Sequence, residues 1–248
     1  MRTIYILWLR QIKRYYRSRS RVIGSLAQPL LFLLALGFGF GPMYQKASGG
    51  NYIEFLTPGI IAMSVLFTSL FFGIEIIWDR QFGFLKETLV APVSRLSIMI
   101  GRTLGGATIA VCQGIIVLII SYLVGFRPVS FMSIPTAMAF MAITAIIFTA
   151  LGTAIASRME DMHGFQLIMN FLVMPLFFLS GAIFPLDDLP KALSIVTKLD
   201  PLSYGVDSIR GTLTGMNHFP MGLNLLVLCA VAVIVVTIGS YLFSKIEI

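Results

Sequence analysis

Six long apolar stretches dominate this 248-residue sequence and include only one of its 18 basic and 11 acidic residues, Glu75. At a rise of about 1.5 Å per residue, each stretch can cross a hydrocarbon core of about 30 Å as an α-helix. Backbone polar groups in lipid must be satisfied internally, and the alternating segments of a β-barrel are not found. The sequence therefore predicts an all-α membrane protein with six transmembrane helices, at about 22–41, 55–77, 104–124, 134–156, 165–184 and 223–243.

The composition excludes the main soluble classes. Hydrophobic residues make up 57% of the chain and charged residues 12%. A soluble fold of this length could not bury so much apolar surface, so an ordinary cytosolic enzyme, a disordered chain and a coiled coil are excluded. A disulfide-rich secreted module is excluded because the chain has only two cysteines.

Basic residues are distributed unevenly between the two predicted sides of the membrane. If the N-terminus is cytoplasmic, 13 Lys and Arg residues lie inside and five outside. Cytoplasmic loops carry the excess of Lys and Arg, so we expect both termini in the cytoplasm and a multi-pass location in the plasma (inner) membrane. The net charge of +7 then reflects topology and contact with anionic lipid. Nucleic-acid binding is not expected, because no soluble domain is left to carry a basic surface.

The segment 1–21 combines apolar and basic residues at helical spacing. Its pattern predicts an interfacial helix on the cytoplasmic leaflet, which serves as a topology anchor or also has a mechanical role. The expected apolar face holds Ile4, Tyr5, Trp8, Ile12, Tyr15 and Tyr16, and the expected basic face holds Arg10, Lys13, Arg14, Arg17 and Arg21.

The predicted cytoplasmic segment 78–103 is too long for a simple connection between two spans. It mixes charged and apolar residues and is interrupted by Pro92. The pattern predicts a short helix that ends near Val90, then a turn and the entry to the third span. Such an amphipathic helix can lie on lipid or dock into a groove of a soluble partner.

Several side chains of this segment are suited to docking. Leu85 and Leu89 are four residues apart, so they share a helical face that could fill a partner's groove. Glu87 and Thr88 offer polar contacts at the rim of that face, and Arg95 could pair with a partner's acid or with a lipid phosphate.

The predicted outer segment 185–222 contains two helical patterns. Asp188 is placed to cap a helix over about 189–198, and Asp200-Pro201 is placed to open a second helix that stops near Gly215. Both helices are apolar, so we expect an outer helical hairpin that sits against or dips into the outer leaflet. Asp200 and Asp207 are expected to cap or pair locally, with Lys198 and Arg210 as candidate partners.

Motifs in these two segments resemble the ABC-2 type transporter permeases, in particular the drug-resistance and nodulation-factor export branch. The first segment carries Asp79-Arg80, Gly83, Leu85, Ala91-Pro92-Val93-Ser94-Arg95 and Gly101-Arg102. The second region carries Leu179-Ser180-Gly181-Ala182-Ile183-Phe184-Pro185, Leu189-Pro190, Asp200-Pro201-Leu202-Ser203-Tyr204-Gly205-Val206-Asp207 and Arg210-Gly211. One departure is Lys86, where the family usually has an acidic residue; the acid here is Glu87.

The resemblance implies a single ABC-2 type transmembrane domain over 1–248. It implies a permease subunit that pairs with a second copy of itself or a similar permease, through the first and fifth spans. It also implies a separate nucleotide-binding subunit that holds ATP and Mg, so export of an amphipathic, drug-like, lipid-like or glycan substrate would be driven by that subunit. The expected contacts with the ATPase subunit are Gly83, Leu85, Glu87, Thr88, Leu89, Pro92 and Arg95.

The sequence itself agrees with this division of labour. It contains no G-x-x-x-x-G-K-[ST] loop, so no nucleotide site is expected in this chain. His163 and His218 fall in predicted loops on opposite sides of the membrane, so no metal site is expected, and no cluster of Asp, His or Ser residues indicates a catalytic or cofactor site. The alternative function is a self-sufficient secondary transporter or channel, which usually carries ionisable groups near the midplane. Glu75 is the one candidate for an intramembrane polar site; snorkelling, or pairing with Arg80 or Arg102, is the structural alternative.

Overall fold

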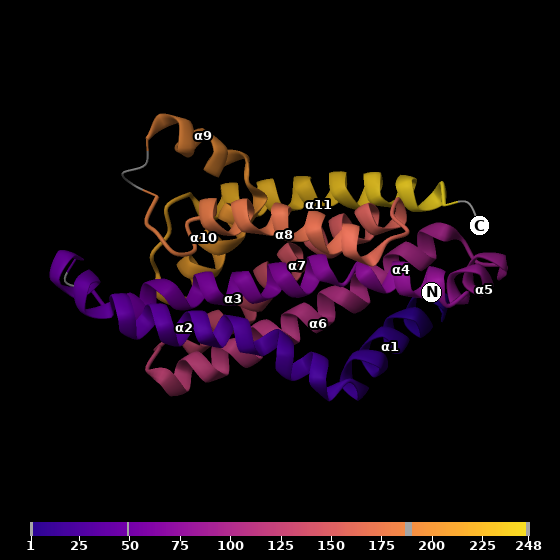
Figure 1. The fold of residues 1–248 in the computed structure, drawn as a ribbon. Helices are drawn as coiled ribbons and strands as arrows, with labels where there is room; N and C mark the ends of the chain where they lie inside the picture. Colours follow the sequence, from indigo (N-terminus) through magenta and orange to yellow (C-terminus); the bar gives the residue numbers. More distant parts are fainter. Residues whose placement is uncertain (1, 49, 187–189, 247–248) are drawn as a thin grey trace.

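The computed structural model describes residues 2–48, 50–186 and 190–246, which form an elongated bundle of α-helices (Figure 1). Six segments are long and apolar enough to cross a membrane, so the expected fold class is confirmed. These segments are Arg19–Lys46, Tyr52–Gln81, Arg95–Val124, Phe131–Ser157, Met162–Leu179 and Met221–Ser244.

The second spanning segment consists of two helices. Helix α3 (Tyr52–Phe71) is followed, after a break at Phe72 and Gly73, by α4 (Ile74–Gln81). A Cβ atom at Gly73 would lie 2.3 Å from the carbonyl oxygen of Gly152 in α7 (Ile134–Ser157, after the short 3₁₀ helix η1, Phe131–Ser133). The break therefore occurs where the backbones of two spans approach each other closely.

The segment after α4 folds as the sequence predicts. Helix α5 (Phe84–Val90) ends at Val90, the turn contains Pro92, and α6 (Arg95–Val124) begins after the N-cap Ser94. The Oγ of Ser94 accepts a hydrogen bond from the backbone N–H of Ser97 at 3.2 Å. This cap satisfies one of the free N–H groups of the first turn of α6.

The fifth span is shorter than predicted. Helix α8 (Met162–Leu179) ends five residues before the expected limit at 184. The chain then turns through Gly181, whose φ of +74° lies in the left-handed region that favours glycine. Apolar composition continues through this turn because it is buried, so hydropathy alone could not locate the end of the helix.

Helix α1 (Arg2–Arg17) packs along α6, and the contact surface differs from the expected apolar face. Leu7 and Gln11 are buried, whereas Tyr5 and Tyr16 are exposed. A Cβ atom at Gly101 would lie 2.9 Å from Cβ of Leu7, and one at Gly105 would lie 2.8 Å from Cβ of Gln11. The two glycines, spaced as G-x-x-x-G, thus allow α1 to approach α6.

The segment between the fifth and sixth spans contains one exposed and one buried helix. Helix α9 (Lys191–Leu199) is largely exposed, and α10 (Pro201–Thr214) packs against α3, α7 and α11 (Met221–Ser244). Asp200 caps α10 by accepting the N–H of Leu202 at 2.8 Å, and α10 ends at Gly215, as the sequence predicts. The predicted cap at Asp188 lies outside the described residues.

The two ends of the bundle carry different elements. Figure 1 shows α1, α4, α5 and the C-terminal end of α11 at one end, here called the α5 end, and α9 and α10 at the other, here called the α9 end. Helix α2 (Arg19–Ser48) runs from the α5 end toward the α9 end and has a largely exposed surface. The start of α1 and the end of α11 therefore both lie at the α5 end, as an even number of spans requires.

Candidate functional site: a charged cluster, a docking helix and a recess

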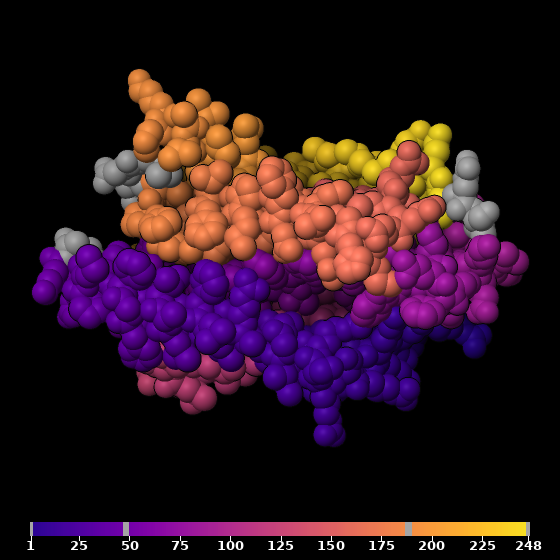
Figure 2. Space-filling view, viewed as in Figure 1, coloured from indigo at the N-terminus to yellow at the C-terminus, as the bar shows by residue number. Residues whose placement is uncertain are grey.

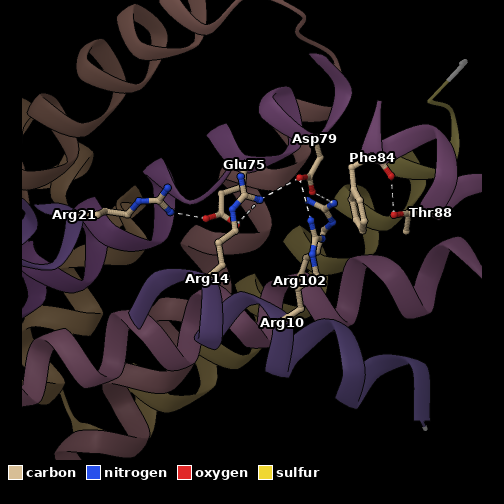
Figure 3. Close-up of polar contacts among 8 residues, drawn as sticks. All are labelled: Arg10, Arg14, Arg21, Glu75, Asp79, Phe84, Thr88 and Arg102. Carbon is tan, nitrogen blue, oxygen red and sulfur yellow. Dashed lines mark hydrogen bonds and ion pairs between the residues drawn. The ribbon is translucent and has the colours of Figure 1, made fainter. Parts of the chain in front are cut away.

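Two buried carboxylates of α4 bind arginines from three other helices at the α5 end (Figure 3). The Nη1 of Arg21, in α2, lies 2.6 Å from Oε1 of Glu75. The Nη1 of Arg14, in α1, lies 3.1 Å from Oδ1 of Asp79 and 3.8 Å from Oε2 of Glu75. Asp79 also binds Nη2 of Arg102 in α6 and Nη2 of Arg10 in α1, the latter at 3.3 Å. We call these six residues the arginine–carboxylate cluster.

The partners expected for Glu75 were wrong. Arg102 binds Asp79, and Arg80 donates to the carbonyl oxygens of Met159 at 3.1 Å and Ser157 at 3.0 Å. Arg80 is five positions after Glu75, so the two side chains point in directions about 140° apart on α4. The arginines that reach Glu75 come from α1 and α2, which the sequence does not place next to α4.

The arginine–carboxylate cluster also contacts the start of α5. The guanidinium carbon of Arg10 lies 3.6 Å from the centroid of the Phe84 ring, within the range of a cation–π interaction. Since the cluster joins α1, α2, α4 and α6, a displacement of α5 would act on four helices through it. Asp79 is the carboxylate shared by three of the four arginines.

The glycine before α5 and residues within α5 fix the position and shape of this helix. Gly83 precedes it with a φ of +77°, which permits the sharp change of direction from α4. Leu85 is 2% exposed and packs in the hydrophobic core, so it anchors α5 instead of facing outward as the sequence suggested. The Oγ1 of Thr88 donates to the carbonyl of Phe84 at 2.9 Å within the same helix (Figure 3).

The outward surface of α5 is formed by other side chains. Phe82, in the turn between α4 and α5, and Val90, the last residue of α5, are 81% and 79% exposed. Glu87 is exposed, and Leu89 is half-buried. A groove of about 440 Å³ lies beside these residues, lined by Arg80, Gln81, Leu85, Lys86, Leu89, Glu160 and Ile246.

The side chain of Arg95, which follows the turn at Pro92, is bound within the protein and does not extend away from it. Its Nη1 donates to the carbonyl oxygens of Ser244 and of Ile246, the latter at 3.0 Å. Arg95 therefore ties the start of α6 to the end of α11. In this structure Arg95 therefore positions the segment between α5 and α6 and is not a free charge.

A recess opens between α2 and α8, visible in Figure 2 as a hollow between the indigo and orange helices. It has a volume of about 440 Å³, typical of a small-molecule site. Its apolar lining is mainly aromatic, and its polar lining combines the Arg21–Glu75 pair with amide and hydroxyl groups. The polar residues are Tyr15, Arg21, Ser25, Gln28, Thr68, Glu75, Gln166 and Asn170.

Two of these amides are unusual for a membrane helix. Gln166 and Asn170 are four residues apart on α8, line the recess and are exposed. By contrast, the one amide of α11, Asn224, is buried and donates to Asp207 at 2.8 Å. Exposed amides are costly in lipid, so this face of α8 is suited to water, a partner chain or a ligand.

The polar groups at the α9 end form local structure. Asp207 accepts the N–H groups of His218 at 2.6 Å and Phe219 at 3.0 Å, and so fixes the loop before α11. Arg210 instead donates to the carbonyl of Gly181 at 2.9 Å, so the expected partner of Asp207 was wrong. Burial raises the pKa of Asp200 to about 7 and lowers the pKa of Arg210 to about 10.

Sequence reasoning missed Asp79 and the two amides of α8 as site residues. The sequence contains a spacing pattern that points to each of these residues. Glu75 and Asp79 are four residues apart on one face of α4, and Gln166 and Asn170 repeat the same spacing on α8. Their partners could not be identified, because they come from helices distant in the sequence.

The six apolar helices, the polar recess among them and the amphipathic helix outside them together define a multi-pass membrane protein of the transport type. The sequence comparison identifies the family. The ABC-2 type transporter family matches residues 2–214, and the chain belongs to it.

Similar proteins include nodulation protein J and a putative transport permease from several organisms. The chain is 28% identical over 245 residues to nodulation protein J of Rhizobium leguminosarum bv. viciae, covering 96% of this chain and 94% of the relative. It is also 28% identical to nodulation protein J of Rhizobium meliloti (strain 1021), with coverage of 96% and 93%. The putative transport permease ycf38 of Cyanophora paradoxa is 29% identical over 214 residues, with coverage of 84% and 72%.

Proposed function

We propose that this chain is the transmembrane subunit of an ATP-driven exporter. Two such subunits, identical or similar, associate with separate ATPase subunits that bind ATP and Mg. The complex moves an amphipathic substrate, drug-like, lipid-like or glycan, out of the cytoplasm across the plasma (inner) membrane. Both termini and the α5 end then face the cytoplasm, which agrees with the excess of basic residues there.

The observation that supports ATP coupling most directly is the placement of α5. The exposed Phe82, in the turn before α5, and Val90, at the end of α5, are available to a partner, while Leu85 anchors the inner face of the helix. Phe84 contacts Arg10 of the arginine–carboxylate cluster, which extends to α1, α2 and α6. A partner that moves α5 would therefore move the helices that border the recess.

The recess supports an amphipathic substrate. Aromatic side chains such as Phe71 and Trp78 can contact apolar groups, and Gln28, Gln166 and Asn170 can bind polar ones. The recess lies between α2 and α8, which are the first and fifth spans. These are the helices that we propose to pair with the second permease subunit, so the second copy would complete the pathway.

Copurification tests the docking of an ATPase on α5. Val90→Asp places a charge on an exposed apolar position and should leave the fold intact. If Val90 is an interface anchor, its loss should weaken ATPase binding by about thirtyfold. The tagged protein is purified from its own host, and the ATP hydrolysis that accompanies it is measured. The matched control is Val129→Asp, which is 73% exposed in the segment after α6.

Each outcome of this experiment separates the candidate functions. Loss of the ATPase with Val90→Asp but not with Val129→Asp supports the exporter. Equal ATPase recovery with both variants contradicts docking through α5. If no ATPase accompanies the unaltered protein and transport continues, the chain is a self-sufficient transporter or channel.

Thiol labelling tests the orientation. Cys112 and Cys229 are first replaced by serine, and single cysteines are then introduced at Lys86 in α5 or at Lys191 in α9, both exposed. In intact cells an impermeant maleimide should label Lys191→Cys and spare Lys86→Cys until the membrane is permeabilised. The opposite pattern would reverse the proposed topology.

A further inference from the structure

A second hollow, which shares Tyr15 and Ile109 with the recess between α2 and α8, lies where α1 meets α2. The two helices join at Ser18, and a groove of about 450 Å³ runs between this junction and α6. We call it the elbow groove. Arg19 and Tyr16 lie at its polar end, and Ile23, Leu26 and Ile116 line the rest together with Cys112. From Thr108 to Ile116 the α6 wall is about 12 Å long.

The walls of the elbow groove are fixed by hydrogen bonds. The hydroxyl of Tyr15 donates to Oε1 of Gln113 at 3.1 Å, and Nε2 of Gln113 donates to the carbonyl of Ser25 at 2.7 Å. The Nε1 of Trp8 donates to Oγ1 of Thr108 at 3.0 Å. These bonds connect α1, α2 and α6, so the groove is built into the structure and does not depend on one mobile side chain.

The charge at the polar end of the elbow groove is uncompensated. Glu75 and Asp79, the acids of α4, are engaged by the arginine–carboxylate cluster. Arg19 is exposed and forms no ion pair with an acid among the residues that the structure describes. A ligand with a negative group can therefore pair with Arg19 while its apolar chain contacts Ile23 and Leu26.

The groove also lies at the boundary between charged and apolar sequence. Arg21 is the last charged residue before the apolar run of α2 begins at Val22. If the apolar run of α2 lies in the hydrocarbon core, Arg19 lies at the depth of lipid headgroups. The groove crosses this boundary, as a phospholipid does.

We propose that the elbow groove binds an anionic phospholipid from the leaflet on the α1 side. Its phosphate pairs with Arg19, and one acyl chain lies along Ile23, Leu26 and Ile116. The lipid would rest against the Tyr15–Gln113 hydrogen bond and thereby stabilise the angle between α1 and α2. Arg19, the charged residue of this site, does not line the recess between α2 and α8.

Fluorescence quenching by lipid tests this site. The chain has two tryptophans, so Trp78→Phe leaves Trp8, which binds the groove residue Thr108, as the reporter. The full chain is reconstituted in bilayers that contain phosphatidylglycerol or phosphatidylcholine with brominated acyl chains. Quenching as a function of lipid fraction gives the relative affinity of the site for the two lipids. We expect phosphatidylglycerol to be favoured by about fivefold.

Variants at two neighbouring arginines decide between a specific site and general attraction. Arg19→Gln should reduce the preference to near unity, and Arg19→Lys should retain it. The control Arg17→Gln removes the same charge from an exposed residue that does not line the groove, and it should retain the preference. No preference in the parent protein, or an equal loss in Arg17→Gln and Arg19→Gln, would overturn the proposal. Elution of each variant at the parent's size verifies folding.

Discussion

Arg21 and Glu75 form a close ion pair, with 2.6 Å between Nη1 and Oε1, that joins the start of α2 to α4. The Glu75 side chain is almost fully buried, and the Arg21 side chain is 31% exposed at the edge of the recess. Glu75 is the one charged residue in the apolar stretches of the sequence, and the structure gives it a partner from a different span.

We predict measurable coupling between Arg21 and Glu75. A buried carboxylate without its partner is destabilising, so the two single alanine variants should lose more stability together than the double variant does. The expected coupling free energy is about 1–2 kcal/mol, discounted for the partial exposure of Arg21. Thermal unfolding of the purified protein measures this coupling free energy.

The Arg80–Glu160 pair is the control. Its charged atoms are 3.7 Å apart and Glu160 is 88% exposed, so its coupling free energy should stay below about 0.5 kcal/mol. Equal coupling in both pairs would contradict a special role for Glu75.

Gly152 should not tolerate a side chain. A Cβ atom there would lie 2.3 Å from the carbonyl oxygen of Leu70, where α7 approaches α3. Gly152→Ala forces these backbones apart, and we expect a loss of about 1–3 kcal/mol or failure to fold. A Cβ at Gly39 in α2 would meet no atom within 4 Å, so Gly39→Ala should be neutral or stabilising by up to about 1 kcal/mol. Comparable unfolding temperatures for the two variants would show that α3 and α7 are not in this close contact.

Asp200 should make stability depend on pH. Burial raises its pKa to about 7, above the 3.8 of the unfolded chain, so the folded state binds more protons between these values. Stability contributed by the protonated group is present below about pH 4 and is lost as the pH rises to about 7, by at most about 4 kcal/mol. Asp200→Asn keeps an acceptor for the N–H of Leu202. In this variant the unfolding temperature should depend less on pH between pH 5 and pH 8.

Asp161 provides the opposite control for this pH dependence. It caps α8, and the N–H groups of Gly164 and His163 lower its pKa. Stability from Asp161 is therefore present above its unfolded pKa and lost as the pH falls through the folded value. Asp161→Asn should leave the dependence of the unfolding temperature on pH unchanged from pH 5 to pH 8. A weaker dependence in this variant would show that the effect is not specific to Asp200.

The recess between α2 and α8 should contain water. Maleimides react with the thiolate, which forms in water and not in lipid. In a background without Cys112 and Cys229, Asn170→Cys should therefore react at least about tenfold faster with a hydrophilic maleimide than Phe171→Cys. Asn170 lines the recess, whereas the adjacent Phe171 is 83% exposed and does not. Similar reaction rates at the two positions would show that the recess is occluded by lipid or by a partner.

The sequence predicted the local elements of this protein well. Apolar length determined the six membrane-length helices, and Pro92 and Ser94 marked the turn between α5 and α6. Asp200 and Gly215 marked the two ends of α10. These features depend on helix rise, backbone dihedral preferences and capping, which act over a few neighbouring residues.

Tertiary structure decided which groups meet. The sequence showed that Glu75 needs a partner but not that α2 supplies it, and it assigned Leu85 outward where packing turns it inward. It also could not show that Gln166 and Asn170 share a recess with Arg21. Composition and periodicity act within one segment, and they determined by themselves that this chain crosses the membrane as helices. Pairing between helices depends on which backbones approach closely, as at Gly152 and Gly105, and only the assembled bundle determines that.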